Sequence, residues 1–87
     1  MSLKIKANSF ATQRYLEVDA TGITFCETSF LGGKRRFPFS AVDVVLMSAD
    51  NQLSFQVGQE VFQLPVSPNN KKHQQVINAL IQGVSQA

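Results

Sequence analysis

The stretch QLSFQVGQEVFQLPVSPNNKKHQQVINALIQGV, residues 52–84, decides the fold. In its first half apolar residues alternate with polar ones, which is the pattern of strands that bury one face. Two such runs, residues 52–57 and 60–66, predict a β-hairpin whose Gly58 fits a tight turn that needs a positive φ. In the second half apolar residues recur at spacings of one, three and four, which predicts an amphipathic helix.

The predicted helix spans residues 68–83 and follows directly on the hairpin. Ser67 is a good N-cap, and Pro68 suits the first helical position, where a missing N–H costs nothing. Gly83 stands where a C-cap is expected. The apolar stripe consists of Val76, Ile77, Leu80, Ile81 and Val84. Such a stripe must be buried, so we expect the helix to close the open face of the strands that precede it.

The residues upstream repeat the strand pattern. Residues 15–19 and 23–26 alternate on either side of a turn at Gly22. Residues 29–33 contain paired glycines and predict a loop or a sharp bend. The Phe-Pro-Phe run at residues 37–39 indicates an edge or bulged strand, because proline donates no ladder hydrogen bond.

Two more apolar runs complete a mostly β architecture. Residues 42–47 are apolar on both faces apart from Asp43, which predicts a strand covered on both sides or buried at a contact. Residues 3–6 could add a first strand. We therefore expect a six- or seven-stranded antiparallel barrel or sandwich capped by one C-terminal helix. Residues 1–87 are expected to form a single domain with its core in residues 13–84.

Composition limits the class of protein. The 87 residues carry a net charge of only +2, so any polyanion-binding role needs local clustering of cations. Cys26 is the one cysteine, which excludes an internal disulfide and fits a small packing residue in a reducing compartment. Residues 1–20 lack the apolar run of a signal peptide, and no stretch is long enough for a membrane span. We expect a cytoplasmic protein without cofactor or metal.

The order of elements resembles the pleckstrin-homology (PH) superfold, including its small bacterial versions and the related GRAM domains. The run LEVDATGITF, residues 16–25, looks like the family's pair of strands around a glycine turn. The run RRFPFSAV, residues 35–42, is similar to its basic and aromatic-Pro-aromatic passage. Phosphoinositide-binding members carry a basic motif in the first hairpin loop, whereas the turn at residues 20–22 has no basic residue. The resemblance therefore implies a binding scaffold rather than phosphoinositide recognition.

One basic run is a candidate site. In GGKRR, residues 32–36, two glycines precede three cations that could hold a phosphate or a carboxylate. Strand alternation places Lys34 and Arg36 on one face and Arg35 on the other. The simpler interpretation is a charged strand edge that resists aggregation. Two lysines also open the helix, where cations oppose its dipole. The candidate ligand-binding residues are Lys34, Arg35, Arg36, Lys71 and Lys72.

Two hypotheses for the function follow. No catalytic constellation is visible, and His73 flanks the apolar stripe as a packing residue, so an enzyme is not expected. The first hypothesis is a non-enzymatic interaction module that binds a protein segment or assembles with copies of itself. The apolar runs at residues 37–39 and 44–47 favour it, because exposed edges and apolar patches invite pairing. The alternative is a module that binds an anion, a lipid headgroup or nucleic acid, through residues 34–36.

Overall fold

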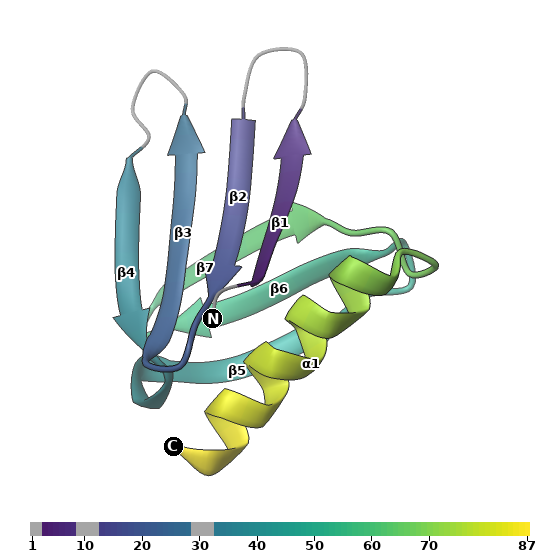
Figure 1. Cartoon of the computed structure of the whole chain (residues 1–87). Helices are drawn as coiled ribbons and strands as arrows, with labels where there is room; N and C mark the ends of the chain where they lie inside the picture. The colour runs from purple at the N-terminus through teal and green to yellow at the C-terminus, as the bar shows by residue number, and fades with distance from the viewer. Residues whose placement is uncertain (1–2, 9–12, 29–32) are drawn as a thin grey trace.

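The computed structural model describes residues 3–8, 13–28 and 33–87, and the following elements are those of the described residues (Figure 1). The first sheet has the order β1 Leu3–Asn8, β2 Gln13–Val18, β3 Gly22–Thr28 and β4 Lys34–Pro38. The second sheet has the order β5 Val42–Met47, β6 Gln52–Val57 and β7 Glu60–Pro65. A short 3-10 turn, η1 Phe39–Ala41, joins the sheets, and the chain ends in α1 Lys71–Gln86. All pairings are antiparallel, so the predicted mostly β fold with one closing helix is confirmed.

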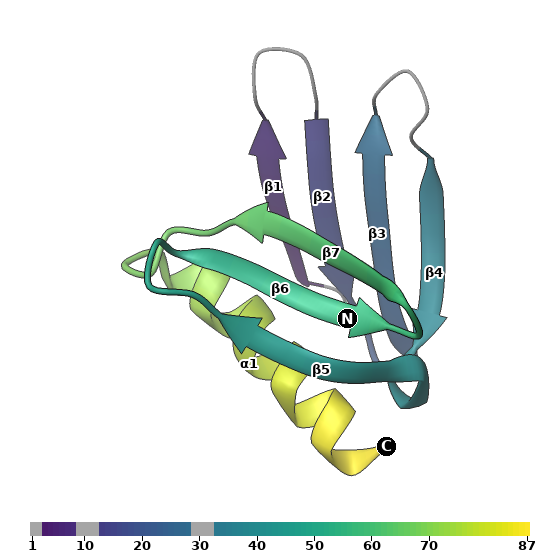
Figure 2. The same cartoon turned by 180° about the vertical axis from the view of Figure 1, so that it is seen from behind.

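The two sheets cross each other. Figure 1 and Figure 2, which view the molecule from opposite sides, agree that the strands of the second sheet run across those of the first. In both views the strands of the first sheet extend past β7 at one end. The helix α1 packs against β1, β2, η1 and β5. The fully buried side chains of this core are Ile5, Leu16, Ile23, Leu53, Phe55, Leu64, Val76 and Leu80.

The hairpin β6–β7 forms as predicted, with Gly58 at φ 62°. Its register places Phe55 opposite Phe62, and their rings stack with centroids 5.1 Å apart. The ring of Phe25 reaches both from β3, with centroid distances of 5.7 and 5.2 Å. Aromatic pairs of this kind contribute about 0.5–1.5 kcal/mol beyond the burial of their surface, so this cluster ties the two sheets together.

The helix begins at Lys71, three residues later than predicted, and its N-cap is Asn70 rather than Ser67. The Asn70 side-chain oxygen accepts hydrogen bonds from the backbone N–H groups of Lys72 and His73, at 2.9 and 3.2 Å. Ser67 instead belongs to the preceding turn, where its N–H donates to His73 Nδ1 at 2.9 Å. The imidazole therefore fixes the approach of the chain to the helix, which is a structural role.

Gly83 is not the predicted C-cap, because the helix continues to Gln86. A Cβ atom at Gly83 would lie 2.5 Å from Cε1 of Phe39. The glycine is needed for this close approach, which lets the aromatic ring of η1 pack directly on the helix backbone. The loop predicted over residues 29–33 lies outside the described residues except for Gly33, and the first strand predicted over residues 3–6 is present as β1.

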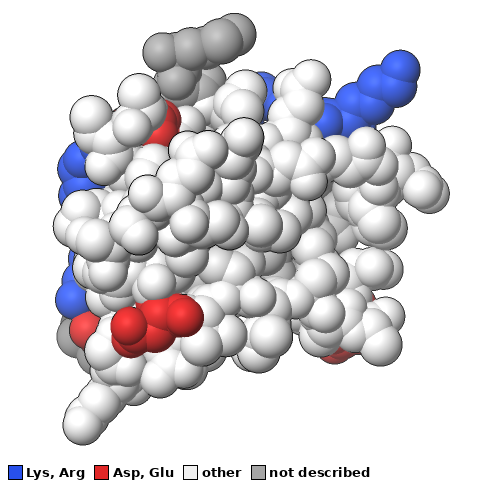
Figure 3. All heavy atoms as spheres, turned by 90° about the horizontal axis from the view of Figure 1, so that it is seen from below, with Lys and Arg blue, Asp and Glu red and all other residues white. Residues whose placement is uncertain are grey.

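The strand β5 is not covered on both faces, which is one of the two alternatives predicted for it, the other being burial at a contact. In the described sheet it pairs with β6 alone, and the side chains of Val44, Leu46 and Met47 are 40, 62 and 46% exposed. A bulge shifts the register between Val42 and Val44, and Asp43 accepts a hydrogen bond from the Gly58 N–H at 3.1 Å. Figure 3 views the underside, where β5 and α1 lie, and shows that its centre carries no charged side chain.

Candidate functional site

Three charged residues of the first sheet occupy positions that face the second sheet. On β2, Arg14 has the same parity as the buried Leu16, and it pairs in register with Glu27 of β3. On β4, Arg35 has the parity of the buried Phe37 and pairs with Phe25. Figure 1 shows that the first sheet extends past β7. All three inward positions line a pocket between the two sheets instead of the core.

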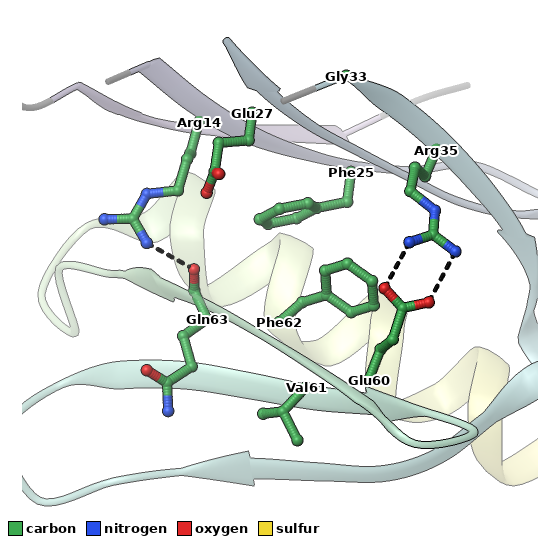
Figure 4. Close-up of a pocket in the computed structure, with 9 residues that line it drawn as sticks. All are labelled: Arg14, Phe25, Glu27, Gly33, Arg35, Glu60, Val61, Phe62 and Gln63. Carbon is green, nitrogen blue, oxygen red and sulfur yellow. Dashed lines mark hydrogen bonds and ion pairs between the residues drawn. The ribbon is translucent and has the colours of Figure 1, made fainter. Parts of the chain in front are cut away.

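This pocket is a cleft of about 680 Å³ between the inner face of β2–β4 and the strand β7. Its volume falls within the range of ordinary ligand pockets. Figure 4 shows the rings of Phe25 and Phe62 at its centre, with Arg14 and Glu27 to one side and Arg35 with Glu60 to the other. The lining residues are Arg14, Phe25, Glu27, Gly33, Arg35, Glu60, Val61, Phe62 and Gln63.

One end of the cleft is closed by a two-pronged ion pair between Arg35 of β4 and Glu60 of β7. The two N–O distances are 2.5 and 2.9 Å, and the guanidinium also lies 5.6 Å from the ring centre of Phe62. The hydrogen bonds raise the pKa of Arg35 and lower the pKa of Glu60. Both side chains are about half exposed, at 47 and 55%, so the pair positions β4 against β7 more than it stabilises the fold.

The other end of the cleft holds charged groups with spare hydrogen-bonding capacity. Arg14 donates from Nη1 to the backbone carbonyl of Gln63 at 2.9 Å, while its Nε is buried without an acceptor among the described residues. Within the same described ranges, no group pairs with the Glu27 carboxylate, although Figure 4 shows it beside Arg14. The unpaired Nε of Arg14 and the unpaired carboxylate of Glu27 therefore lie on the side of the cleft next to the rings of Phe25 and Phe62.

The predicted basic run is divided between two faces of the first sheet, as its alternation indicates. Arg35 enters the cleft, whereas Arg36 lies on the outer face and donates to Asp19 at 2.9 Å and to Thr24 at 2.9 Å. The Arg36 guanidinium holds the pKa of the Asp19 carboxyl well below its usual range. Lys34 is exposed at the start of β4. The three cations therefore do not form one anion site.

The two lysines that open the helix lie far from this run. Lys71 and Lys72 are exposed in the first turn of α1. Figure 1 and Figure 2 agree that the start of α1 and the strand β4 lie on opposite sides of the molecule. The candidate residues of the sequence thus fall into three places: the cleft, the outer face of the first sheet, and the helix start.

Sequence reasoning missed Arg14, Glu27 and Glu60 as site residues. Strand alternation could have indicated two of them, because residues two apart in a strand share a face. Arg14 stands two residues before the buried Leu16, and Glu27 stands two residues after Phe25. Among the described residues, no group of His, Cys, Asp and Glu could hold a metal ion, and no helix is long and apolar enough to cross a membrane. Comparisons of the chain with protein-family models, curated proteins and solved structures found no match.

Proposed function

We propose that this chain is a non-enzymatic interaction module on a PH-like scaffold, which binds an extended protein segment in the cleft. The scaffold assignment is supported by the arrangement of a four-stranded and a three-stranded antiparallel sheet followed by a C-terminal helix. A cytoplasmic location is part of the proposal, and the buried thiol of Cys26 is compatible with a reducing compartment.

The observation that carries the proposal is the direction of the β7 backbone. The carbonyl of Gln63 accepts from Arg14, which belongs to the other sheet, so it points away from β6 and into the cleft. In an antiparallel strand every second residue directs its N–H and C=O to the same side, so Val61 presents its backbone there as well. An added extended segment can pair with such an edge by main-chain hydrogen bonds.

The charges of the cleft favour a neutral peptide group over an anion. The cleft contains two arginines and two glutamates, so its charges balance. A peptide group offers one acceptor to a terminal nitrogen of the Arg14 guanidinium and one donor to the Glu27 carboxylate, so it pairs with both side chains without bringing in charge. An apolar side chain of the segment then rests on the rings of Phe25 and Phe62, which supply the apolar part of the contact.

The proposal is tested by NMR titration with N-acetyl-phenylalanine N-methylamide, a probe with two peptide groups and one aromatic side chain. We expect saturable shifts of amides in β2, β3 and β7. The variant Arg14→Met removes one donor and should weaken binding about tenfold, as for a hydrogen bond to a charged group. Lys34→Met is the matched control, because it removes the same charge from the exposed outer face and should leave the affinity unchanged.

Two results would contradict this function. N-acetyl-phenylalanine, which carries a free carboxylate in place of the methylamide, should bind more weakly, because the charges of the cleft already balance without it. Tighter binding of the carboxylate form would show an anion site instead of a peptide site. Shifts outside the cleft, or equal losses in Arg14→Met and Lys34→Met, would show that the probe binds elsewhere. The amide spectrum of each variant reports in the same experiment whether the fold is intact.

The alternative, an anion-binding module, is favoured by one observation on the outer face of the first sheet. The register brings Lys34 of β4 into one row with Lys6 of β1, across Tyr15 and Cys26. This alternative predicts salt-sensitive binding to anionic vesicles or to a single-stranded oligonucleotide, weakened in Arg36→Ala. Because Arg36 already pairs with Asp19, the anion-binding module is a weaker candidate than the peptide-binding module.

A further inference from the structure

The exposed apolar side chains of the described residues gather on β5. Five large apolar residues are more than one-third exposed: Val44, Leu46, Met47, Val61 and Ile81. Three of the five belong to β5, and two of these, Val44 and Leu46, line a small pocket together with Val61 of β7. Ile81 belongs to α1, which packs against β5. Single exposed apolar residues are ordinary, but a cluster beside an open strand edge marks an interaction surface.

The edge of β5 also lacks the protection that the other outer strands carry. In the described sheets, β1 carries Lys4 and Lys6 and β4 carries three cations and a proline, whereas on β7 the charge and the proline, Glu60 and Pro65, stand only at the two ends of the strand. Charges and prolines at edge strands prevent unwanted pairing. From residue 44 to residue 47, β5 has neither, because its one charge, Asp43, sits at the bulge and accepts the hydrogen bond from Gly58.

We propose that β5 pairs with β5 of a second copy of this chain, at a surface separate from the cleft. An antiparallel strand edge is its own complement about a two-fold axis, so the same residues serve both partners. Residues 44–47 are uncharged, and the centre of the underside carries no charge either, so no like charges meet (Figure 3). The two three-stranded sheets then join into one continuous sheet, with Leu46 of each copy beside apolar side chains of the other copy on the same face.

The size of the surface predicts a weak dimer. The exposed apolar area on β5 and at Ile81 is roughly 300–400 Å² per copy, which matches the larger apolar patches of monomers. Twice this area, with the backbone edges, lies at the low end of specific protein interfaces. We therefore expect a concentration-dependent equilibrium, with a dissociation constant on the order of micromolar rather than nanomolar.

Sedimentation of the full chain over a range of concentrations tests the proposal. The wild-type chain should pass from monomer to dimer, and Leu46→Lys should weaken the dimer several-fold, because it removes an apolar contact and places two like charges close together across the two-fold axis. Val61→Lys is the matched control, since it replaces an equally exposed apolar residue on the same sheet, at β7. This variant should dimerise like the wild type.

Hydrogen exchange separates edge pairing from stacking of sheet faces. Edge pairing should slow the exchange of β5 amides as the wild-type concentration rises, and this protection should be lost in Leu46→Lys. A chain that stays monomeric at high concentration would overturn the proposal, whether or not β5 binds another protein. Equal loss of the dimer in Val61→Lys, or protection outside β5, would also overturn it, because the contact would then involve the face of the sheet.

Discussion

Gly22 is the position where one added methyl group should do the most damage. It begins β3 and pairs with Pro38 at the end of β4. A Cβ atom there would lie 2.3 Å from the carbonyl oxygen of Phe37 and 3.1 Å from Cα of Pro38. Both neighbours are backbone atoms, so no change of side-chain rotamer relieves the contact. The variant Gly22→Ala therefore has to push β4 away from β3.

The cost of this displacement has two parts. Overpacking in a well-packed interior costs about 1–3 kcal/mol, and the shift also moves Phe37, which is 9% exposed in the core. Weakening one ladder hydrogen bond adds about 1 kcal/mol. We expect Gly22→Ala to lower the free energy of unfolding by about 2–4 kcal/mol, which corresponds to a fall in melting temperature of about 10–25 °C for a chain of this length.

Urea and thermal unfolding followed by circular dichroism measure this effect. The control is Gly33→Ala, because a Cβ atom at Gly33 has nothing within 4 Å. This substitution should change stability by no more than about 1 kcal/mol, on the stabilising side, since alanine restricts the unfolded chain. Equal stability of the two variants would refute the reasoning, because the close contact between β3 and β4 would then not exist as described.

Two further predictions concern single side chains. Because Arg36 depresses the pKa of Asp19, the charged carboxylate stabilises the folded chain above the ordinary pKa of aspartate, and this contribution is lost as the pH falls below that value. Asp19→Asn should therefore lower the urea midpoint at neutral pH, and its difference from wild type should shrink below about pH 4; a difference that is constant with pH would contradict this. Asn70→Ala should cost about 1 kcal/mol in urea unfolding through loss of the N-cap, whereas Asn69→Ala, its exposed neighbour, should be close to neutral, and equal effects would argue against the cap.

The regular elements could be predicted because their periods are local properties of the sequence. The alternation around Gly58 and the apolar stripe from Val76 to Val84 each specify one element without reference to the rest of the chain. The start of the helix could not be predicted in this way, since Ser67 and Asn70 are both good N-caps. In the structure the Asn70 side chain caps the helix and the backbone N–H of Ser67 donates to His73, six residues further along the chain.

The site was predicted only in part, for a related reason. Alternation separates Arg35 from its two basic neighbours, and the structure confirms that separation. The partner of Arg35 is Glu60, 25 residues away on the other sheet, and no local pattern joins them. The sequence shows that Arg14 and Glu27 point to the inner face of the first sheet. Whether they line the core or the cleft depends on how far the second sheet extends along the first, and this extent is a property of the assembled fold.

The cleft and the β5 surface share a physical basis, since each places side chains where folding alone does not favour them. A charged side chain at an inward position, such as Arg14, contributes no apolar packing to the core, and an apolar side chain at an outward position, such as Leu46, is exposed to water. Local departures from the pattern of a fold are expected where a protein binds.

The strand β6 separates β5 from β7, so a second copy on β5 leaves the cleft open. A dimer of this kind presents two clefts, and a partner with two suitable segments gains affinity from binding both.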